Sequence, residues 1–385
     1  MTHGTFIRKN ALRNKRRTAL TVLSVGFSLF LLITLQTVLD TLINPPETES
    51  SILRVAVRHA VALTQPLPMA YQAKLEAVPH VESVMPMQWF GGQYKEPKNF
   101  FANFSVGHEE FFDMFPEYEY SQGAEEAFKR ERIAAIVGDA LMDQFGWTIG
   151  DRITLTGTIF PMDLEFKIAG TYSDDVNDSA FYFRHDYLDE AGEDADVVGM
   201  VGMVGTFWLM ADSAEAVPGI IEHVDSMFRN TPYETKTETE KAFQLGFVSM
   251  LGNVRLLIGS ISIVVVFTML LVAGSTMAMT IRERLKEVAI LKAIGYPRKV
   301  ILSLVLGEAA AVSLMGALVG CGLSLVLASM DVARFTAGFV QGINPSPAML
   351  AMALGLGIVM GVLSGLFPAI QASGMSINDA MRRLE

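Results

Sequence analysis

The chain contains four long stretches without a charged side chain, separated by polar segments. Each is at least as long as the roughly 20 apolar residues that a helix needs to cross a bilayer. Buried helices of soluble proteins rarely stay apolar on every side over such a length. The pattern therefore predicts four transmembrane helices, at 18–42, 252–280, 300–329 and 348–371.

The first stretch has a second interpretation, as a cleaved signal peptide. Its apolar part is longer than the roughly 7–15 residues of a signal core. The chain continues with the sequence DTLINPP at 40–46, which offers no cleavage site with small residues at the required spacing. We therefore interpret the first stretch as a retained anchor.

Lys and Arg are concentrated in three segments, and this sets the expected orientation. Segments 1–17, 280–299 and 372–385 together carry 14 bases and 4 acids, a net charge of +10. Segment 45–247 carries 34 acids and 14 bases, a net charge of −20. Positively charged flanks stay in the cytoplasm. We therefore expect a basic lead-in at 1–17, a loop at 281–299 and a helical tail at 372–385 inside, with 45–247 and a short loop at 330–347 outside.

The outer segment is too long for a simple connecting loop and has the alternating patterns of a folded domain. We expect helices at 69–77, 139–145 and 214–228. Strands are expected at 81–86, 133–137, 150–156, 164–172, 205–210 and 233–237, with 164–172 as the hairpin partner of 150–156. This order predicts an α+β domain, with a second subdomain inserted at 117–200.

Overall composition and the absence of several motifs exclude some classes of function. The net charge of −11 argues against a nucleic-acid binder, which would carry a basic surface. A single cysteine, Cys321, excludes an intramolecular disulfide and a thiolate metal cluster. The sequence has no P-loop, no G-x-S-x-G motif and no H-E-x-x-H motif. We therefore expect no catalytic residues, no metal and no cofactor bound by the chain itself.

The inner loop at 281–299 reads as a short amphipathic helix. Gly295 suits a left-handed position just after a helix, and Pro297 prevents its continuation. Such a helix could dock into a groove on another protein or simply lie on the membrane. The candidate docking residues are Glu283, Arg284, Glu287, Leu291, Lys292, Ala293, Gly295 and Tyr296.

Three motifs lie next to the predicted spans. They are the basic lead-in with ALRN at 11–14, the loop with ER at 283–284 and EVAILKAIG at 287–295, and the segment PAIQAS at 368–373. Together they resemble the FtsX/MacB-type permease family of bacterial ABC transporters. The outer segments at 136–141 and 149–155 resemble the family's periplasmic core. Met381 departs from the leucine usual in the family's terminal helix.

The resemblance implies a permease in the bacterial inner membrane that works with a separate ATPase subunit, which binds the ATP. It also implies a second permease copy or a sister permease as partner, and movement of the outer domain driven by the inner loop. Membrane lipid and a periplasmic adaptor or hydrolase are further expected partners, whereas nucleic acid is not.

Several residues inside the predicted spans stand out. Glu308 is an acid within an apolar helix, where a charge costs a few kcal/mol. It is interpreted either as structural, bonding a neighbouring helix or the inner loop, or as part of an ion path. Pro368 is expected to kink or end the last span. Small residues that permit close helix packing are Gly316, Gly320, Gly357, Gly361 and Gly365.

Two functions of different kinds remain after this reading, and a third is less well supported. The chain either helps to extrude or release a lipoprotein, lipid, peptide or drug, or it switches a periplasmic cell-wall hydrolase without transport. A membrane-anchored binding protein without an ATPase is the third hypothesis. The two-part outer domain favours transport, because a simple switch needs only one docking surface.

Overall fold

The computed structural model describes residues 15–44, 47–99, 101–174, 178–194, 201–250, 252–330 and 344–374. It divides into two units that are considered separately. One, the helix unit, comprises the described residues up to 42 and from 252 onward. The other, the α+β unit, comprises the described residues from 43 to 250. Residues 1–14 of the basic lead-in predicted at 1–17, residues 331–343 of the loop predicted at 330–347 and residues 375–385 of the tail predicted at 372–385 lie outside the described residues.

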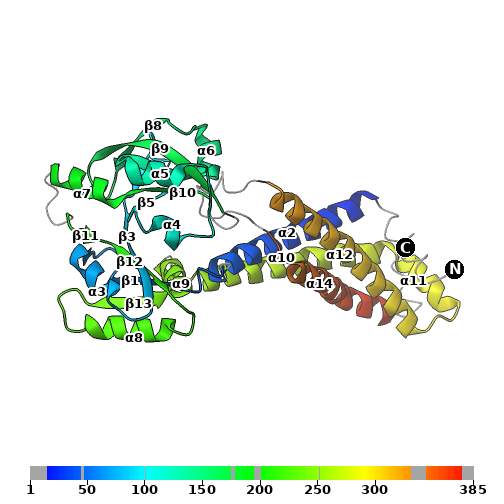
Figure 1. Ribbon diagram of the computed structural model, residues 1–385. Coiled ribbons are helices and arrows are strands. Elements are labelled where there is room, and N and C mark those ends of the chain that lie inside the picture. Colours follow the sequence, from blue (N-terminus) through cyan, green and yellow to red (C-terminus); the bar gives the residue numbers. More distant parts are fainter. Residues whose placement is uncertain are drawn as a thin grey trace. The chain divides into compact units, whose positions relative to one another are not determined.

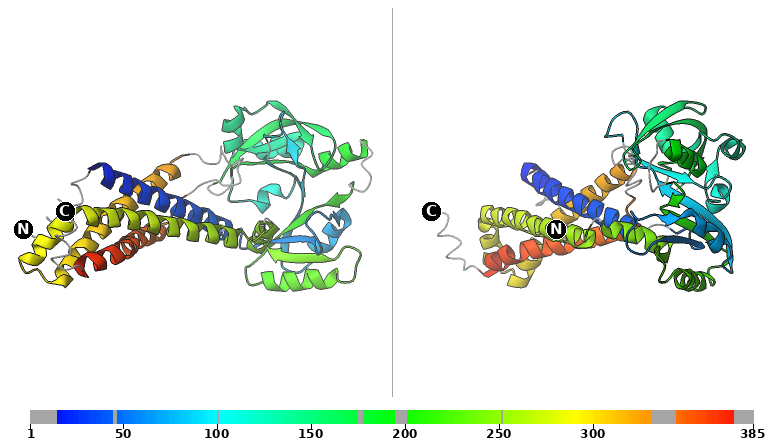
Figure 2. Two further views of the ribbon diagram at one scale, coloured as in Figure 1. Left: turned by 180° about the vertical axis from the view of Figure 1, so that it is seen from behind. Right: turned by 90° about the vertical axis from the view of Figure 1, so that its left-hand side faces the viewer.

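The helix unit contains four helices that are long and apolar enough to cross a membrane. A short helix, α11 (Leu285–Ala293), lies between the second and third of them. The four are α2 (Lys15–Ile43), α10 (Val254–Glu283), α12 (Arg298–Ala328) and α14 (Pro347–Gly374). Figures 1 and 2 show α12 and α14 packed along each other.

Pro368 lies inside α14, which continues to Gly374. Of the two effects predicted for Pro368, it does not end the helix, and a kink at this position stays a prediction. Proline cannot donate the backbone hydrogen bond to the preceding turn. The neighbouring side chains are small at Gly365 and Ala369, and the latter is fully buried against the bundle. Tertiary packing thus carries the helix through the proline.

The α+β unit is built on one long mixed sheet (Figure 1). Its main path follows the order β13–β1–β12–β3–β5–β10–β7–β9–β8–β4. The pairs β5–β10 and β7–β9 are parallel, and the other pairs are antiparallel. The strands in chain order are β1 (Arg54–His59), β2 (Leu67–Pro68), β3 (Val81–Trp89), β4 (Gly92–Gln93), β5 (Ala102–Val106), β6 (Glu119–Tyr120), β7 (Ala134–Gly138), β8 (Arg152–Gly157), β9 (Asp163–Ser173), β10 (Ala180–Arg184), β11 (Met203–Val204), β12 (Thr206–Ala211) and β13 (Thr235–Thr239).

Helices cover this sheet, and several begin where turn chemistry predicts. The helix predicted at 139–145 is α6 (Asp139–Phe145), which starts after Gly138 and ends at Gly146 with φ 66°. The predicted hairpin is the antiparallel pair β8–β9. The remaining helices are η1 (Met69–Tyr71), α3 (Gln72–Glu76), α4 (Phe111–Met114), α5 (Ala124–Arg130), α7 (His185–Asp194), α8 (Val217–Met227) and α9 (Glu240–Met250). The prediction of four apolar helices with an α+β domain between the first two is confirmed.

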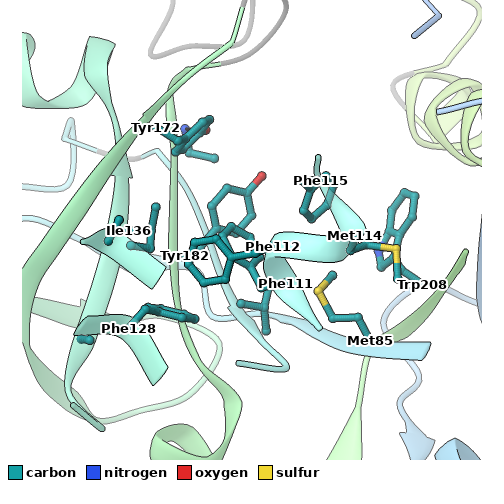
Figure 3. Close-up of a cluster of buried hydrophobic side chains, with 14 of the residues drawn as sticks. Met85, Phe111, Phe112, Met114, Phe115, Phe128, Ile136, Tyr172, Tyr182 and Trp208 are labelled. Carbon is teal, nitrogen blue, oxygen red and sulfur yellow. Dashed lines mark hydrogen bonds between the residues drawn. The ribbon is translucent and has the colours of Figure 1, made fainter. Parts of the chain in front are cut away.

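The core of the α+β unit falls into three clusters of buried side chains. One lies around β1, β12, α3 and α8, and a second lies around β7 to β10 and α6. The third cluster contains the aromatic residues of α4 together with Tyr172, Tyr182 and Trp208 (Figure 3). The part of the sheet that contains the strands of 117–200 also includes β4 and β5, which precede residue 117 in the chain. An inserted subdomain confined to 117–200 stays a prediction.

Candidate functional site

The short helix α11 lies between two sharp changes of chain direction. Arg284 links the end of α10 to α11 with non-helical backbone angles, φ −108° and ψ 14°. At the other end, Gly295 has φ 97°, and its N–H donates to the carbonyl of Lys292 at 3.0 Å. The N–H of Tyr296 donates to the carbonyl of Leu291 at 3.1 Å. These bonds satisfy carbonyls at the end of α11, in the geometry expected for glycine just after a helix.

The side chains of α11 and of the turn after it separate into an inner and an outer set. Ala289 is 4% exposed and forms the inner face. The large apolar side chains of Ile290, Ile294 and Tyr296 are 58%, 70% and 44% exposed. Ala293, one of the candidate docking residues, is exposed. Leu291 and Lys292 are half-buried.

Arg284 is the centre of a group of charges behind α11. Its Nε donates to Glu287 Oε2 at 2.9 Å, and its Nη1 donates to Glu308 Oε2. Glu308 lies on α12 and is only 8% exposed. Arg284 therefore turns toward α12, and its role in docking stays a prediction. The contact matches the structural interpretation of Glu308, as a residue that bonds the inner loop.

Further polar contacts join the other helices at the same end of the bundle. Arg17 of α2 donates to Glu283 of α10 at 2.5 Å. Arg298 at the start of α12 donates to Ser373 Oγ of α14 at 3.4 Å. With the Arg284–Glu308 pair, these contacts connect α2 to α10, the α11 segment to α12, and α12 to α14. The pair of Arg17 and Glu283 was not predicted, because their separation of 266 residues hides it in the sequence.

A pocket lies between α10, α11 and α12, directly behind the Arg284 group. Its walls are mostly apolar, and Arg284, Glu287 and Glu308 supply the charged part. The apolar lining residues are Met277, Ile281, Val288, Leu291, Ile301, Leu304 and Val305. Val288 and Leu291 of α11 therefore share this pocket with Ile301, Leu304 and Val305 of α12.

The five predicted packing glycines all lie at helix contacts. Gly316 and Gly320 face α2, where a Cβ at Gly320 would lie 2.7 Å from the carbonyl oxygen of Gly26. Gly357, Gly361 and Gly365 of α14 instead face α12. A Cβ at these three positions would lie 2.7–2.8 Å from side-chain atoms of Ala317, Ser313 and Ala309. Helix α12 thus presents two rows of small residues, each against a different neighbour.

In the α+β unit a serine, a histidine and an aspartate side chain lie next to one another in that order. Ser105 Oγ lies 2.8 Å from His185 Nδ1, and His185 Nε2 lies 3.8 Å from Asp189. Ser105 is fully buried and His185 is 4% exposed, so a substrate cannot reach the hydroxyl. The order of groups resembles a nucleophile with its base, but the burial makes it a packing interaction. Among the described residues, no group of three or more His, Cys, Asp or Glu side chains could hold a metal ion.

Comparisons with known proteins match both units. A family model described as "MacB-like periplasmic core domain" matches residues 18–225, and one described as "FtsX-like permease C-terminal" matches residues 259–377. The Macrolide export ATP-binding/permease protein MacB of Neisseria gonorrhoeae is 33% identical over 34% of this chain and 20% of its own length. An uncharacterized ABC transporter permease of Bacillus subtilis, YvrN, is 33% identical over 28% of this chain and 25% of its own.

These matches therefore span about a fifth to a quarter of each relative's length. Among solved structures, the periplasmic region of MacB from Actinobacillus actinomycetemcomitans aligns with 51% of this chain and 92% of its own. That alignment has 13% identity and a TM-score of 0.37.

Proposed function

Because the chain belongs to the MacB/FtsX-type family of ABC transporter permeases, we propose that it couples ATP hydrolysis to movement of its α+β unit. In this proposal a separate ATPase subunit binds ATP and docks on α11. Two permease copies, or this chain and a sister permease, assemble in the inner membrane with their termini in the cytoplasm. The movement extrudes or releases a lipoprotein, lipid, peptide or drug.

The exposed apolar surface of α11 and its following turn is the observation that carries this proposal. Ile290 of α11 is exposed, as are Ile294 and Tyr296 in the turn after it. The ion pair of Arg284 with Glu308 joins this segment to α12. An apolar helix face inserted into a groove is a common mode of protein recognition. The adjacent Arg284 group gives the docked helix a defined connection to α12.

The contacts inside the helix unit support transmission of a push on α11. Force on the segment reaches α12 through Arg284 and Glu308, and reaches α2 through Glu283 and Arg17. The small-residue contacts of α12 with α2 and α14 bring backbones close together. Closely packed backbones resist sliding, because any displacement creates overlap or voids. We therefore expect α2, α12 and α14 to respond as one block.

Extrusion or release of a substrate is favoured over switching of a hydrolase. The α+β unit has three core clusters along one long sheet, which gives it more surface than a single docking contact needs. The name of one matched relative refers to export of macrolides. A deletion strain separates the two functions. Retained lipoproteins or lost export of a compound supports transport, whereas normal export with chained cells supports hydrolase switching.

The docking surface is tested with one charge substitution and a pair of glycine variants. Ile294→Asp places a charge in the exposed apolar surface, and we expect it to abolish co-purification with the ATPase. Gly295→Val places a β-branched residue at a φ of 97°, which such residues rarely adopt. We expect this variant also to lose co-purification with the ATPase. Gly295→Asn, which tolerates positive φ better, is the matched control and should retain the complex. Full complex formation by Ile294→Asp at an unchanged unfolding midpoint would contradict the proposal.

A further inference from the structure

A buried arginine in the α+β unit holds three segments of the chain together. Arg54, the first residue of β1, is 3% exposed. Its Nη2 lies 2.5 Å from Glu117 Oε1, and its Nε lies 2.7 Å from Glu240 Oε2. Its Nη1 also donates to the carbonyl of Met114 at 3.0 Å. We call Arg54, Glu117 and Glu240 the Arg54 cluster.

The cluster lies where the chain enters and leaves the α+β unit. Arg54 begins the first strand after α2, which ends at Ile43. Glu240 begins α9, the last helix before α10. A second ion pair joins the same two segments, because Lys241 Nζ lies 2.8 Å from Glu47 Oε1.

The third member anchors these two segments to the core. Glu117 follows α4, whose side chains pack with Tyr182 and Met85 in the aromatic cluster (Figure 3). It accepts a hydrogen bond from Ser50 Oγ at 2.9 Å, and the guanidinium of Arg54 lies 4.9 Å from the ring centre of Phe115. The segment from α2 and the segment to α10 are therefore joined to each other and to one rigid core.

The charges of the cluster do not balance. One arginine faces two carboxylates, and their side chains are 15% and 13% exposed. Burial raises the pKa of Glu117, but the bonds and charge of Arg54 outweigh it and hold that pKa below its usual value. For Glu240, burial is the largest influence and raises the pKa despite Arg54. Glu117 binds both Nη groups of Arg54, and Glu240 accepts from its Nε–H. Glu240 therefore supplies the contact that ties the start of α9 to β1, although a second buried charge is a cost to folding.

We propose that the Arg54 cluster is the joint through which the segments leading from α2 and to α10 move the α+β unit as one body. Glu240 is the positioning residue that ties α9 to β1. This inference rests on the proposed function, because it assigns the connection that an ATP-driven movement needs. It predicts that the joint can be broken without unfolding the domain.

The test compares Glu240, the first residue of α9, with Glu238 on the preceding strand β13. Glu240→Leu removes the surplus charge and the tie to Arg54. Glu238→Leu is the matched control, because Glu238 also pairs with an arginine of β1, Arg58 at 2.7 Å, and is 9% exposed. The full chain is reconstituted with its ATPase in nanodiscs. Donor and acceptor dyes are attached at Glu222 and Lys299 through non-natural amino acids, and single-molecule energy transfer is recorded with and without ATP.

We expect both leucine variants to stay folded with similar losses in unfolding midpoint, because each removes one carboxylate partner of an arginine. Only Glu240→Leu should lose most of the ATP-dependent shift, while Glu238→Leu retains it. Residues 54 and 240 are the next residues along from the antiparallel pair Val55–Thr239. Opposite residues of antiparallel strands have Cα atoms about 4.5–5.5 Å apart, a separation that a disulfide can span. Arg54→Cys/Glu240→Cys should therefore restore the shift when oxidised and lose it when reduced. This variant also carries Glu117→Gln, which avoids an unpaired buried charge, and Cys321→Ser.

Equal shifts in the two leucine variants would contradict the proposal that the Arg54 cluster transmits the movement. A shift in the cysteine variant that is insensitive to reduction would also contradict it. An absent shift in the wild-type protein while ATP is hydrolysed would instead refute the proposed function.

Discussion

Replacing Gly320 by alanine tests the close packing of α12 against α2. The added Cβ would lie 2.7 Å from the carbonyl oxygen of Gly26 and 3.1 Å from Leu29 Cβ. The first distance is too short for two atoms that are not hydrogen bonded, and the backbone of α2 cannot move as a flexible side chain can. Overpacking of this kind costs about 1–3 kcal/mol. Gly322→Ala is the control, because a Cβ there has no atom within 4 Å.

In both variants, replacing glycine by alanine stabilises the helix by about 1 kcal/mol through its higher helix propensity. This gain cancels in the comparison, so Gly320→Ala should be less stable than Gly322→Ala by about 1–3 kcal/mol. The measurement is unfolding in mixed detergent micelles at increasing sodium dodecyl sulfate, followed by circular dichroism. Equal unfolding midpoints for the two variants would refute the packing of Gly320 against Gly26.

Two further predictions concern the buried charges. Arg284→Leu should destabilise the helix unit by about 3–5 kcal/mol, because Glu308 stays buried without its partner. Glu308→Leu should lower the stability less than Arg284→Leu, because Arg284 keeps its ion pair with Glu287 at 2.9 Å. Equal losses of stability in detergent unfolding would contradict this difference. In the α+β unit the pKa of Glu117 is lowered, so its stabilising contribution is present at neutral pH and is lost as pH falls through that pKa. The stability difference between wild type and Glu117→Gln, measured by thermal unfolding, should therefore shrink on acidification, and a constant difference would argue against the pairing with Arg54.

Local patterns predicted much of this fold, because the signals for helices and turns lie within a few residues. The absence of charge over a long stretch located the four apolar helices, and Gly295 with Pro297 located the end of α11. The strand β10, at 180–184, was not predicted, because all five residues are buried and no alternation marks it. A strand covered on both faces reads as a plain apolar run.

The sequence did not predict which charged residues form ion pairs with one another. Arg284 was predicted as a docking residue, yet it contacts Glu308, 24 positions away on another helix. Arg54 meets Glu240 across 186 positions. Gly26 was not selected among the packing residues, because a small side chain in an apolar stretch carries no mark of the helix it will face. Such pairings depend on tertiary structure, which local periodicity does not encode.

The most direct test of the coupling account is the ATP-dependent distance change in the wild-type protein. Dyes at Glu222 in the α+β unit and Lys299 at the start of α12 are followed in nanodiscs that contain the ATPase. The account predicts a reversible shift in energy transfer that requires a hydrolysis-competent ATPase and disappears in Ile294→Asp. Continued ATP hydrolysis by the assembled complex with no change in energy transfer would contradict it.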